Sequence, residues 1–530
     1  MESDMEHRLC KFIIPVLLVC ACDRGDGMFP DNVGNGYEMG HGMIELGEQL
    51  EDPYSLDNVT KALKSLYPTK SVTLSATDRY VRFLPKDEYE YDRLGDMGVI
   101  LIDHPLDYRI VKDGDYYHDP MVDDDRITWQ YSVVSPSFKF PDDIEYEVLD
   151  ECFIPENAEG TRASDDIDWD AVEAESYRLT GNGDMLKSGS SKGGRQPAEP
   201  HGFIRIIDED YNGGKPVGVK GVKVTVNSFV KFASAYTDEN GEYRIGKTYS
   251  SDIRYRLVFQ NEKGFGIGFN LLLIPASVSA LGMDSPEGVS IVIDRNSDRK
   301  QFSRSVVNNA AYDYYSMTED SDISVRTPPS NLRLWLFQNI GIGCSPMFQQ
   351  GAIIDTGLVK EVLGIYGDIL KVFLPDVLLG LDGCDDFKSI YAAALHQLAH
   401  SSHYMQVGNA YWNKLIEFNL KAFIRSGFIA YGSGTEDDAG YCEVGEMWAY
   451  FIENSMYRER YGAEAALFGT NHWFHPQIFM YIAERGVTRG KIFKSLTSDV
   501  ISGAAVHEKL VSMYPENRSI IDQAFDRYSY

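Results

Sequence analysis

The spacing of apolar residues predicts an α+β domain near the N-terminus. Apolar residues recur at helical spacing over Leu56–Leu66, directly after Ser55, which is a typical helix N-cap. Three short apolar runs predict strands: Tyr80–Leu84, Val99–Ile102 and Thr128–Val134. We therefore expect a mixed domain of helices and strands over residues 46–155.

The pattern then changes twice before the C-terminal half. Residues 156–200 are rich in acids, glycine and serine, and this composition predicts a solvated linker. Over 201–275, apolar and polar residues alternate, as at Val222–Val226, which is typical of half-buried strands. This predicts a small all-β unit, followed by a connector over 276–304.

From residue 305 to 530 the apolar spacing becomes mainly helical, so the third domain is predicted to be mainly α-helical. The expected helices are 331–340, 358–374, 386–406, 410–426, 440–461, 475–485 and 504–511. Asp385 and Asp386 stand where an N-cap and a first turn belong. The predicted fold class is thus a multidomain chain: an α+β domain, a small all-β unit and a mainly α-helical domain.

Composition and charge narrow the classes of function. The chain has 530 residues with 43% hydrophobic residues, which is enough apolar material for several domains. Its 50 basic and 80 acidic residues give a formal net charge of −30. A surface of this sign repels phosphate backbones, so we expect no nucleic-acid partner.

The N-terminus resembles the signal peptide of bacterial lipoproteins. An apolar run over 12–21 follows Arg8 and Lys11, and it is too short to span a bilayer. It ends in Val19-Cys20-Ala21-Cys22, which resembles a lipobox. The resemblance implies that residues 1–21 are removed, that Cys22 carries the lipid, and that 22–45 form a tether. The expected location is the outer membrane, on its periplasmic or cell-surface side, with the lipid as the membrane contact.

The β unit also resembles a known family. Its residues read Gly-Val-x-Val-x-Val, then Thr237-Asp-Glu-Asn-Gly241 as a turn, then Tyr-x-Leu-x-Phe over Tyr255–Phe259. This pattern resembles the carboxypeptidase regulatory-like, transthyretin-like β-sandwich. That family is usually a structural or adhesive accessory, so the resemblance implies no catalysis in this unit.

The segment with candidate chemistry is His396-Gln-Leu-Ala-His400. Two histidines at i and i+4 lie on one face of a helix, and their imidazoles can reach one zinc ion. His403 lies on the same face, about 10 Å along the axis from His396, and is expected to line a cleft rather than to bind the metal. A third ligand is expected from a second helix, which the segment from Tyr441 to Phe451 supplies.

Together these two segments resemble the gluzincin metallopeptidases, which pair a His-x-x-x-His helix with a later helix reading Glu-x-aromatic-Ala. The resemblance implies that His396 and His400 are zinc ligands and that Glu446 is the third, with Glu443 in reserve. The oxyanion-stabilising His or Tyr of such a cleft would come from the aromatic segment Asn471–His475, with His475 as the named candidate, or from Tyr481. The expected cofactor is Zn²⁺.

One position departs from this family. The family motif is His-Glu-x-x-His, and Gln397 stands where the glutamate belongs. That glutamate is the general base, and an amide cannot take up its proton. Three interpretations stay open: a zinc-binding protein that binds peptides without cutting them, a slow hydrolase with Glu443 or His403 as the base, and a helical domain with two ordinary core histidines.

The sequence therefore predicts a lipid-anchored, zinc-binding, metallopeptidase-like protein that acts on or binds peptide, protein or glycoprotein outside the cytoplasm. Peptidase activity is expected to be weak or absent. The alternative is a non-enzymatic surface binding or adhesion lipoprotein. The remaining cysteines have no Cys-x-x-Cys spacing, and their pairing is left open: they are Cys152, Cys344, Cys384 and Cys442.

Overall fold

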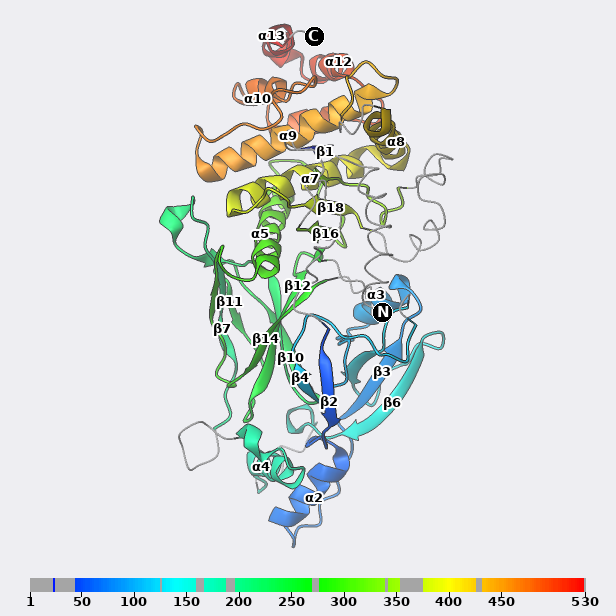
Figure 1. Ribbon diagram of the computed structural model, residues 1–530, viewed down its shortest axis with the longest axis vertical. Helices are drawn as coiled ribbons and strands as arrows, with labels where there is room; N and C mark the ends of the chain where they lie inside the picture. The colour runs from blue at the N-terminus through cyan, green and yellow to red at the C-terminus, as the bar shows by residue number, and fades with distance from the viewer. Residues whose placement is uncertain are drawn as a thin grey trace.

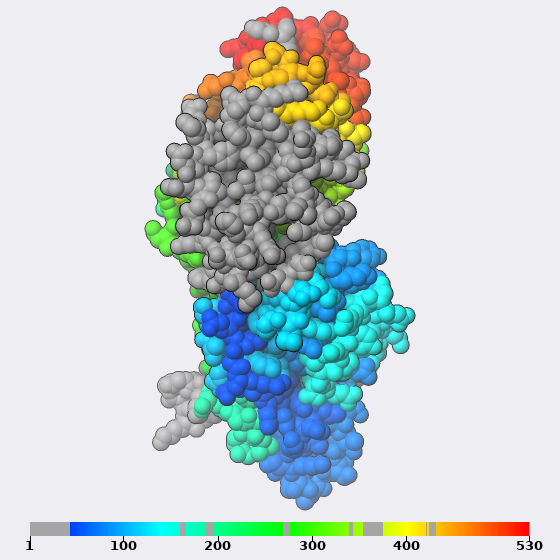
Figure 2. Space-filling view, turned by 45° about the vertical axis from the view of Figure 1, so that its right-hand side comes forward, coloured from blue at the N-terminus to red at the C-terminus, as the bar shows by residue number. Residues whose placement is uncertain are grey.

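The computed structural model describes residues 22–23, 43–123, 126–158, 166–186, 196–268, 276–338, 342–352, 375–425 and 431–528. The molecule is elongated, with N-terminal strands and helices at one end and the C-terminal helices at the other (Figure 1). The space-filling view has the same order, from blue N-terminal residues to red C-terminal residues (Figure 2). Helices and sheets are mixed along the chain, so the coarse α+β prediction is confirmed.

The N-terminal part is built on a small antiparallel sheet of order β5-β3-β6. Its elements are β2 (Glu45–Gln49), α2 (Leu56–Leu66), β3 (Asp78–Leu84), α3 (Glu88–Asp96), β4 (Tyr108–Lys112), β5 (Gln130–Val134) and β6 (Glu145–Cys152). The predicted helix after Ser55 and two of the three predicted strands are present. The strand predicted over 99–102 is wrong, because only Ile102 pairs there, in an isolated bridge with Tyr131.

The segment predicted to be a linker contains a packed helix. Within the described residues 166–186, α4 (Trp169–Leu179) begins at Asp168, whose side chain accepts a hydrogen bond from the Ala171 N–H. Val172 and Tyr177 of α4 are completely buried. Tyr177 packs edge-on against Tyr54 with the ring centroids 5.8 Å apart. The prediction of a solvated linker is therefore wrong for this stretch, because its few apolar residues share one helix face.

Two sheets then pack face to face as a β-sandwich. Their strands are β7 (His201–Ile206), β8 (Val217–Gly218), β9 (Val222–Ser228), β10 (Lys231–Tyr236), β11 (Glu242–Arg244), β12 (Ile253–Asn261), β14 (Val278–Asp284) and β15 (Ile291–Ile293). One sheet joins β10, β9, β12 and β14, and the other joins β11, β7, β15 and β8. The sandwich continues to Ile293, so the connector predicted over 276–304 is wrong. Its residues supply two strands and the start of a helix.

The C-terminal part places a helical layer on a short sheet. Its elements are α5 (Arg299–Glu319), β16 (Arg333–Phe337), β17 (Ile342–Gly343), β18 (Val377–Gly380), α7 (Phe387–Val407), α8 (Asn409–Arg425), α9 (Ala439–Tyr461), α10 (Gln477–Ala483), α11 (Arg489–Ser495), α12 (Gly503–Met513) and α13 (Arg518–Arg527). The helix predicted over 331–340 is wrong, since Arg333–Phe337 form strand β16. The helix predicted over 358–374 lies outside the described residues.

The sheet of the sandwich runs on into the C-terminal part. β13 (Gly266–Ile267) pairs with β12, β16 runs parallel to β13, and β18 runs parallel to β16. β17 is antiparallel to β18 through the Cys344–Leu378 bridge, and its outer edge pairs with β1 (Cys22–Asp23). α7 lies between these strands and α9 (Figure 1).

The described residues also bear on membrane spanning, on the cysteines and on the short 3-10 helices. None of the helices in the described stretches combines the length and the apolar character needed to cross a bilayer. Cys152 and Cys442 are buried free thiols, so neither takes part in one of the open pairings. Single-turn 3-10 helices lie at Pro155–Asn157, Gly183–Leu186, Asn212–Gly214 and Pro515–Asn517.

Candidate metal centre

The candidate centre lies where α7 and α9 pack against each other. α7 begins after Asp386, whose carboxylate accepts a hydrogen bond from the Ser389 N–H at 2.8 Å. The two helices are joined by Trp448, whose indole N–H donates to the Ala399 carbonyl at 3.1 Å. Gly445 allows the close approach of α9 to α8, because a Cβ there would lie 2.9 Å from Leu415 Cδ1.

Three donor atoms from the two helices converge on one point. His396 Nε2 lies 3.2 Å from His400 Nε2. Glu446 places Oε2 3.3 Å from His396 Nε2 and Oε1 3.3 Å from His400 Nε2. All three side chains are at most 2% exposed. This buried group could hold a metal ion.

The separations fit a tetrahedral ion. Tetrahedral ligands at zinc distances of 2.0–2.1 Å lie about 3.3 Å from one another. The two imidazole nitrogens are 3.2 Å apart, and each lies 3.3 Å from a different oxygen of the Glu446 carboxylate, while one ligand atom from each residue can be chosen with all three within 4.8 Å. Two imidazoles and a carboxylate are also a donor set that zinc uses in proteins. The residues present therefore fit a zinc ion, and they equally fit other divalent metals that accept two histidines and a carboxylate.

Glu453, which was not among the predicted site residues, completes the surroundings of His396. Its Oε2 lies 3.0 Å from His396 Nδ1, and the side chain is completely buried. A hydrogen bond from Nδ1 fixes the tautomer, so that Nε2 presents its lone pair to a metal. The sequence indicates only the helix face of Glu453: it follows Glu446 by seven residues and so lies on the same face.

Burial and these contacts shift the pKa values of Glu446, His400 and His396. Burial alone would raise the pKa of Glu446, but the two facing imidazoles outweigh it and hold that pKa well below its usual range. Burial lowers the pKa of His400, whereas for His396 the hydrogen bonds with Glu446 and Glu453 outweigh burial and raise the pKa. A dication at the centre would balance the charges of the two buried carboxylates.

Gln397 points toward the neighbouring strand. Ser345 donates its hydroxyl hydrogen bond to Gln397 Oε1 at 2.8 Å or to the Gln397 carbonyl at 2.9 Å. A Cβ at Gly343 of β17 would lie 3.1 Å from Gln397 Nε2, so the amide lies against this strand. The side chain is 4% exposed. It can donate and accept hydrogen bonds, but it cannot remove a proton from water.

The residues considered as alternative bases lie elsewhere. Glu443, the reserve ligand, accepts a hydrogen bond from the Gly503 N–H at 2.6 Å at the start of α12, and it is not part of the buried group. His403 is 0% exposed, between the rings of Tyr411 and Trp412. Burial lowers the pKa of His403 to about 3, which makes it a poor base at neutral pH. The expectation that it lines an open cleft is therefore wrong.

The aromatic segment after α9 approaches the centre through a different residue. His475 stacks on Tyr528 near the C-terminus, with the ring centroids 6.2 Å apart. His472 instead packs against Tyr431 and Tyr450, and Tyr450 lies edge-on to His396 at 4.4 Å. The hydroxyls of Tyr431 and Tyr450 are 3.0 Å apart. Of this aromatic cluster, Tyr450 contacts His396 directly and Tyr431 is linked to it through Tyr450, whereas the ring of His475 packs on that of Tyr528.

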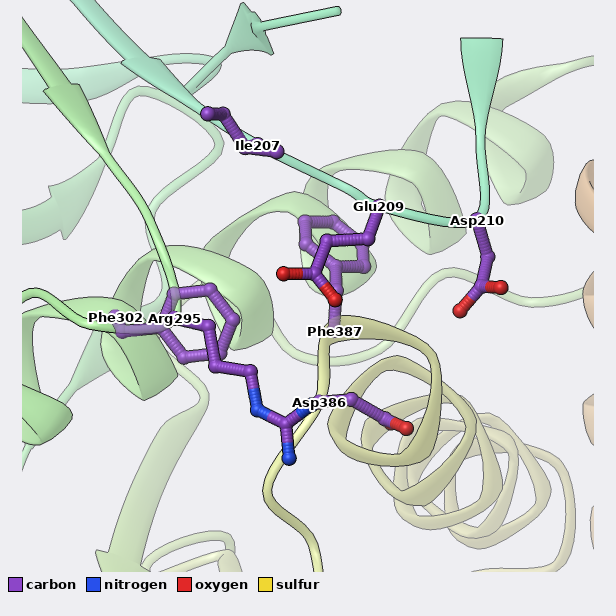
Figure 3. Close-up of a pocket in the computed structure, with 7 residues that line it drawn as sticks. All are labelled: Ile207, Glu209, Asp210, Arg295, Phe302, Asp386 and Phe387. Carbon is purple, nitrogen blue, oxygen red and sulfur yellow. The ribbon is translucent and has the colours of Figure 1, made fainter. Parts of the chain in front are cut away.

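A separate small pocket lies at the first turn of α7, between this helix and the loop after β7 (Figure 3). Two of its four charged lining residues have structural partners: Asp386 caps α7, and Asp210 pairs with Lys388 at 2.9 Å. His396 lies about 14 Å further along the helix axis from Phe387. This pocket is therefore part of the joint between the sandwich and the helices, and not of the metal centre.

Comparison with known proteins gives no relative for this chain: no family model, no curated protein and no solved structure matches it.

Proposed function

We propose that the protein is a zinc-binding, metallopeptidase-like protein that binds peptide, protein or glycoprotein outside the cytoplasm, with weak or no peptidase activity. The observation that carries the proposal is the buried group of His396, His400 and Glu446, in which the two Nε2 atoms are 3.2 Å apart and each lies 3.3 Å from one oxygen of the Glu446 carboxylate. The sequence likeness of the two helices to gluzincin peptidases is the reason for proposing peptides as ligands and peptide hydrolysis as the related reaction. Bound zinc would polarise a peptide carbonyl and a water molecule.

The chain's own residues explain why binding is favoured over cleavage. Gln397 occupies the position of the general base, and its amide is held by Ser345 against the strand. The loss of a general base typically costs about 10²–10⁴-fold in rate. His403, a possible substitute, is buried and weakly basic. We infer that a ligand can be held at this centre with little hydrolysis.

The edge of β17 supports a peptide as the ligand. This strand pairs antiparallel with Cys22–Asp23 of the same chain, so a peptide ligand would pair here in the place of that segment. The same strand lies beside Gln397, one residue after the first metal-binding histidine. Main-chain pairing to a sheet edge is a common mode of peptide recognition. The lipid at Cys22 and the outer-membrane location are part of the proposal and rest on the lipobox-like sequence alone.

Metal analysis of the purified full-length protein tests this function. We expect about one zinc per chain, and its loss in His396→Gln and in His400→Gln. His507→Gln is the matched control, because His507 pairs with Asp522 far from the centre in sequence. A folded wild-type protein that binds no metal after incubation with zinc would overturn the proposal. Stoichiometric iron would keep the centre but reject the peptidase-like assignment.

A further inference from the structure

Three buried ring nitrogens next to the metal centre have no hydrogen-bond partner among the described residues. They are Nδ1 of His400 and both ring nitrogens of His403. Both side chains are at most 2% exposed. An unsatisfied buried polar group typically costs about 1–3 kcal/mol, so three in one place call for an explanation.

Metal binding determines which ring nitrogen of His400 carries the proton. If its Nε2 binds the ion, its Nδ1 carries the proton and must donate it to an acceptor. For His396 that acceptor is Glu453. Gly445 lies beside the other histidine, and a Cβ there would lie 3.8 Å from His400 Cε1 and 3.9 Å from Nδ1. α9 therefore presents no side chain at this position.

His403 is the neighbouring polar residue that can provide an acceptor for the Nδ1 proton of His400. It follows on the same helix at i+3, so the two side chains are neighbours on one face. Trp412 flanks both rings, at 6.0 Å from His400 and 5.8 Å from His403. The indole N–H of Trp412 is already used by the Ser345 carbonyl at 2.8 Å. The two histidines do not bond directly, so a bridging molecule is needed.

We propose that His403 is a positioning residue of the metal centre, and that it orients His400 through one enclosed water molecule. The water accepts the Nδ1 proton of His400 and donates to one ring nitrogen of neutral His403. The proton of His403 sits on its other nitrogen, so the bridge satisfies two of the three ring nitrogens and this one keeps no partner among the described residues. Buried waters typically make about two to four such bonds to otherwise unpaired groups. The inference rests on the metal-binding function proposed above.

A pair of variants of similar size separates hydrogen bonding from packing. His403→Gln keeps a hydrogen-bonding group, whereas His403→Leu removes it. Zinc affinity is measured on the full-length protein by competition with a chromophoric chelator at fixed pH. We expect His403→Leu to lose about 10- to 100-fold in affinity, as for other groups that orient metal-bound histidines. His403→Gln is expected to stay within about threefold of the wild type.

The control is Tyr314→Phe, which removes a buried hydrogen bond to Ser402 on the same helix but no group of the proposed chain. It should leave zinc affinity unchanged. Equal affinity in wild type and His403→Leu, or equal loss in both His403 variants, overturns the proposal. If neither variant folds, ¹⁵N-histidine NMR of the zinc-loaded wild type decides: a slowly exchanging His400 Nδ1 proton supports the water bridge, and a rapidly exchanging one refutes it. A wild type that binds no zinc would instead reject the proposed function itself.

Discussion

The Nδ1 atom of His396 lies 3.0 Å from Oε2 of Glu453, and both residues are buried. This contact leaves His396 Nε2 as the atom that faces His400 and Glu446. We expect Glu453→Gln to lower zinc affinity about 10- to 100-fold, because the amide orients the imidazole less firmly and adds no negative charge. Chelator competition measures the change. Glu459→Gln, an exposed position on the same helix, should bind zinc as the wild type does. Unchanged affinity in Glu453→Gln would show that His396 needs no partner.

Metal removal should loosen the packing of α7 against α9. An ion that binds only the folded state stabilises it by about 4 kcal/mol at a free concentration 1,000 times its Kd. Chelation is therefore expected to lower the melting temperature of the wild type by several degrees, and readdition of zinc should restore it. Glu446→Gln, which lacks one ligand, should melt at the same temperature with and without chelator. A wild type that is indifferent to chelator would mean that the three donors bind no ion in solution.

The metal-binding helices could be predicted because their local signals agree. α7 carries an N-cap at Asp386 and an apolar run over Ile390–Leu395, and its observed range, Phe387–Val407, lies within one residue of the expected one. Because this helix could be predicted, so could the position of His396 and His400 on one of its faces. Strand β16 was mistaken for a helix because Arg333–Phe337 is a short apolar run, and such runs fit both kinds of element.

Contacts between distant segments could not be predicted in the same way. The partnership of Glu453 with His396 joins residues 57 positions apart, and it depends on how two helices cross. The burial of His403 depends on α8, whose Tyr411 and Trp412 cover it. Helical periodicity places a residue on a face, but it does not say which neighbour covers that face. The same limit applies to α4. It has few apolar residues, and the sequence does not show that α2 packs against them.

Asp52 should make stability depend on pH. Burial, together with Asp107 and Asp150, raises its pKa to about 8, although the Tyr54 N–H donates to its Oδ1 at 2.8 Å. In the unfolded chain an aspartate titrates near about 3.9. Between these values the folded state holds the proton that the unfolded state has lost, so stability falls as the pH rises from about 4 to about 8. Unfolding of full-length Asp52→Asn should vary less over this range and should show greater stability at pH 8. Asp142→Asn, at an exposed position, should keep the wild-type slope, and an equal slope in all three proteins would exclude Asp52 as its source.

The most direct test of the disabled-base interpretation is Gln397→Glu. The carboxylate is close to the amide in size, and Ser345 can donate to it as it donates to Gln397 Oε1, so the fold should be kept. The substitution supplies a group that can take a proton from a metal-activated water. We expect hydrolysis of a mixed peptide library to rise by about 10²-fold or more over the wild type, as judged by mass spectrometry of the products.

The double variant Gln397→Glu, Glu446→Gln decides where such activity arises. It retains the new carboxylate but lacks a metal ligand, so hydrolysis at this centre should vanish, whereas a contaminating protease would persist. If Gln397→Glu binds zinc but cuts nothing, the missing base is not the sole reason for inactivity. The wild type would then be a binding protein whose centre also lacks the groups that stabilise the transition state. Tyr450 would have no catalytic role despite its position beside His396, and neither would Tyr431, which bonds to Tyr450.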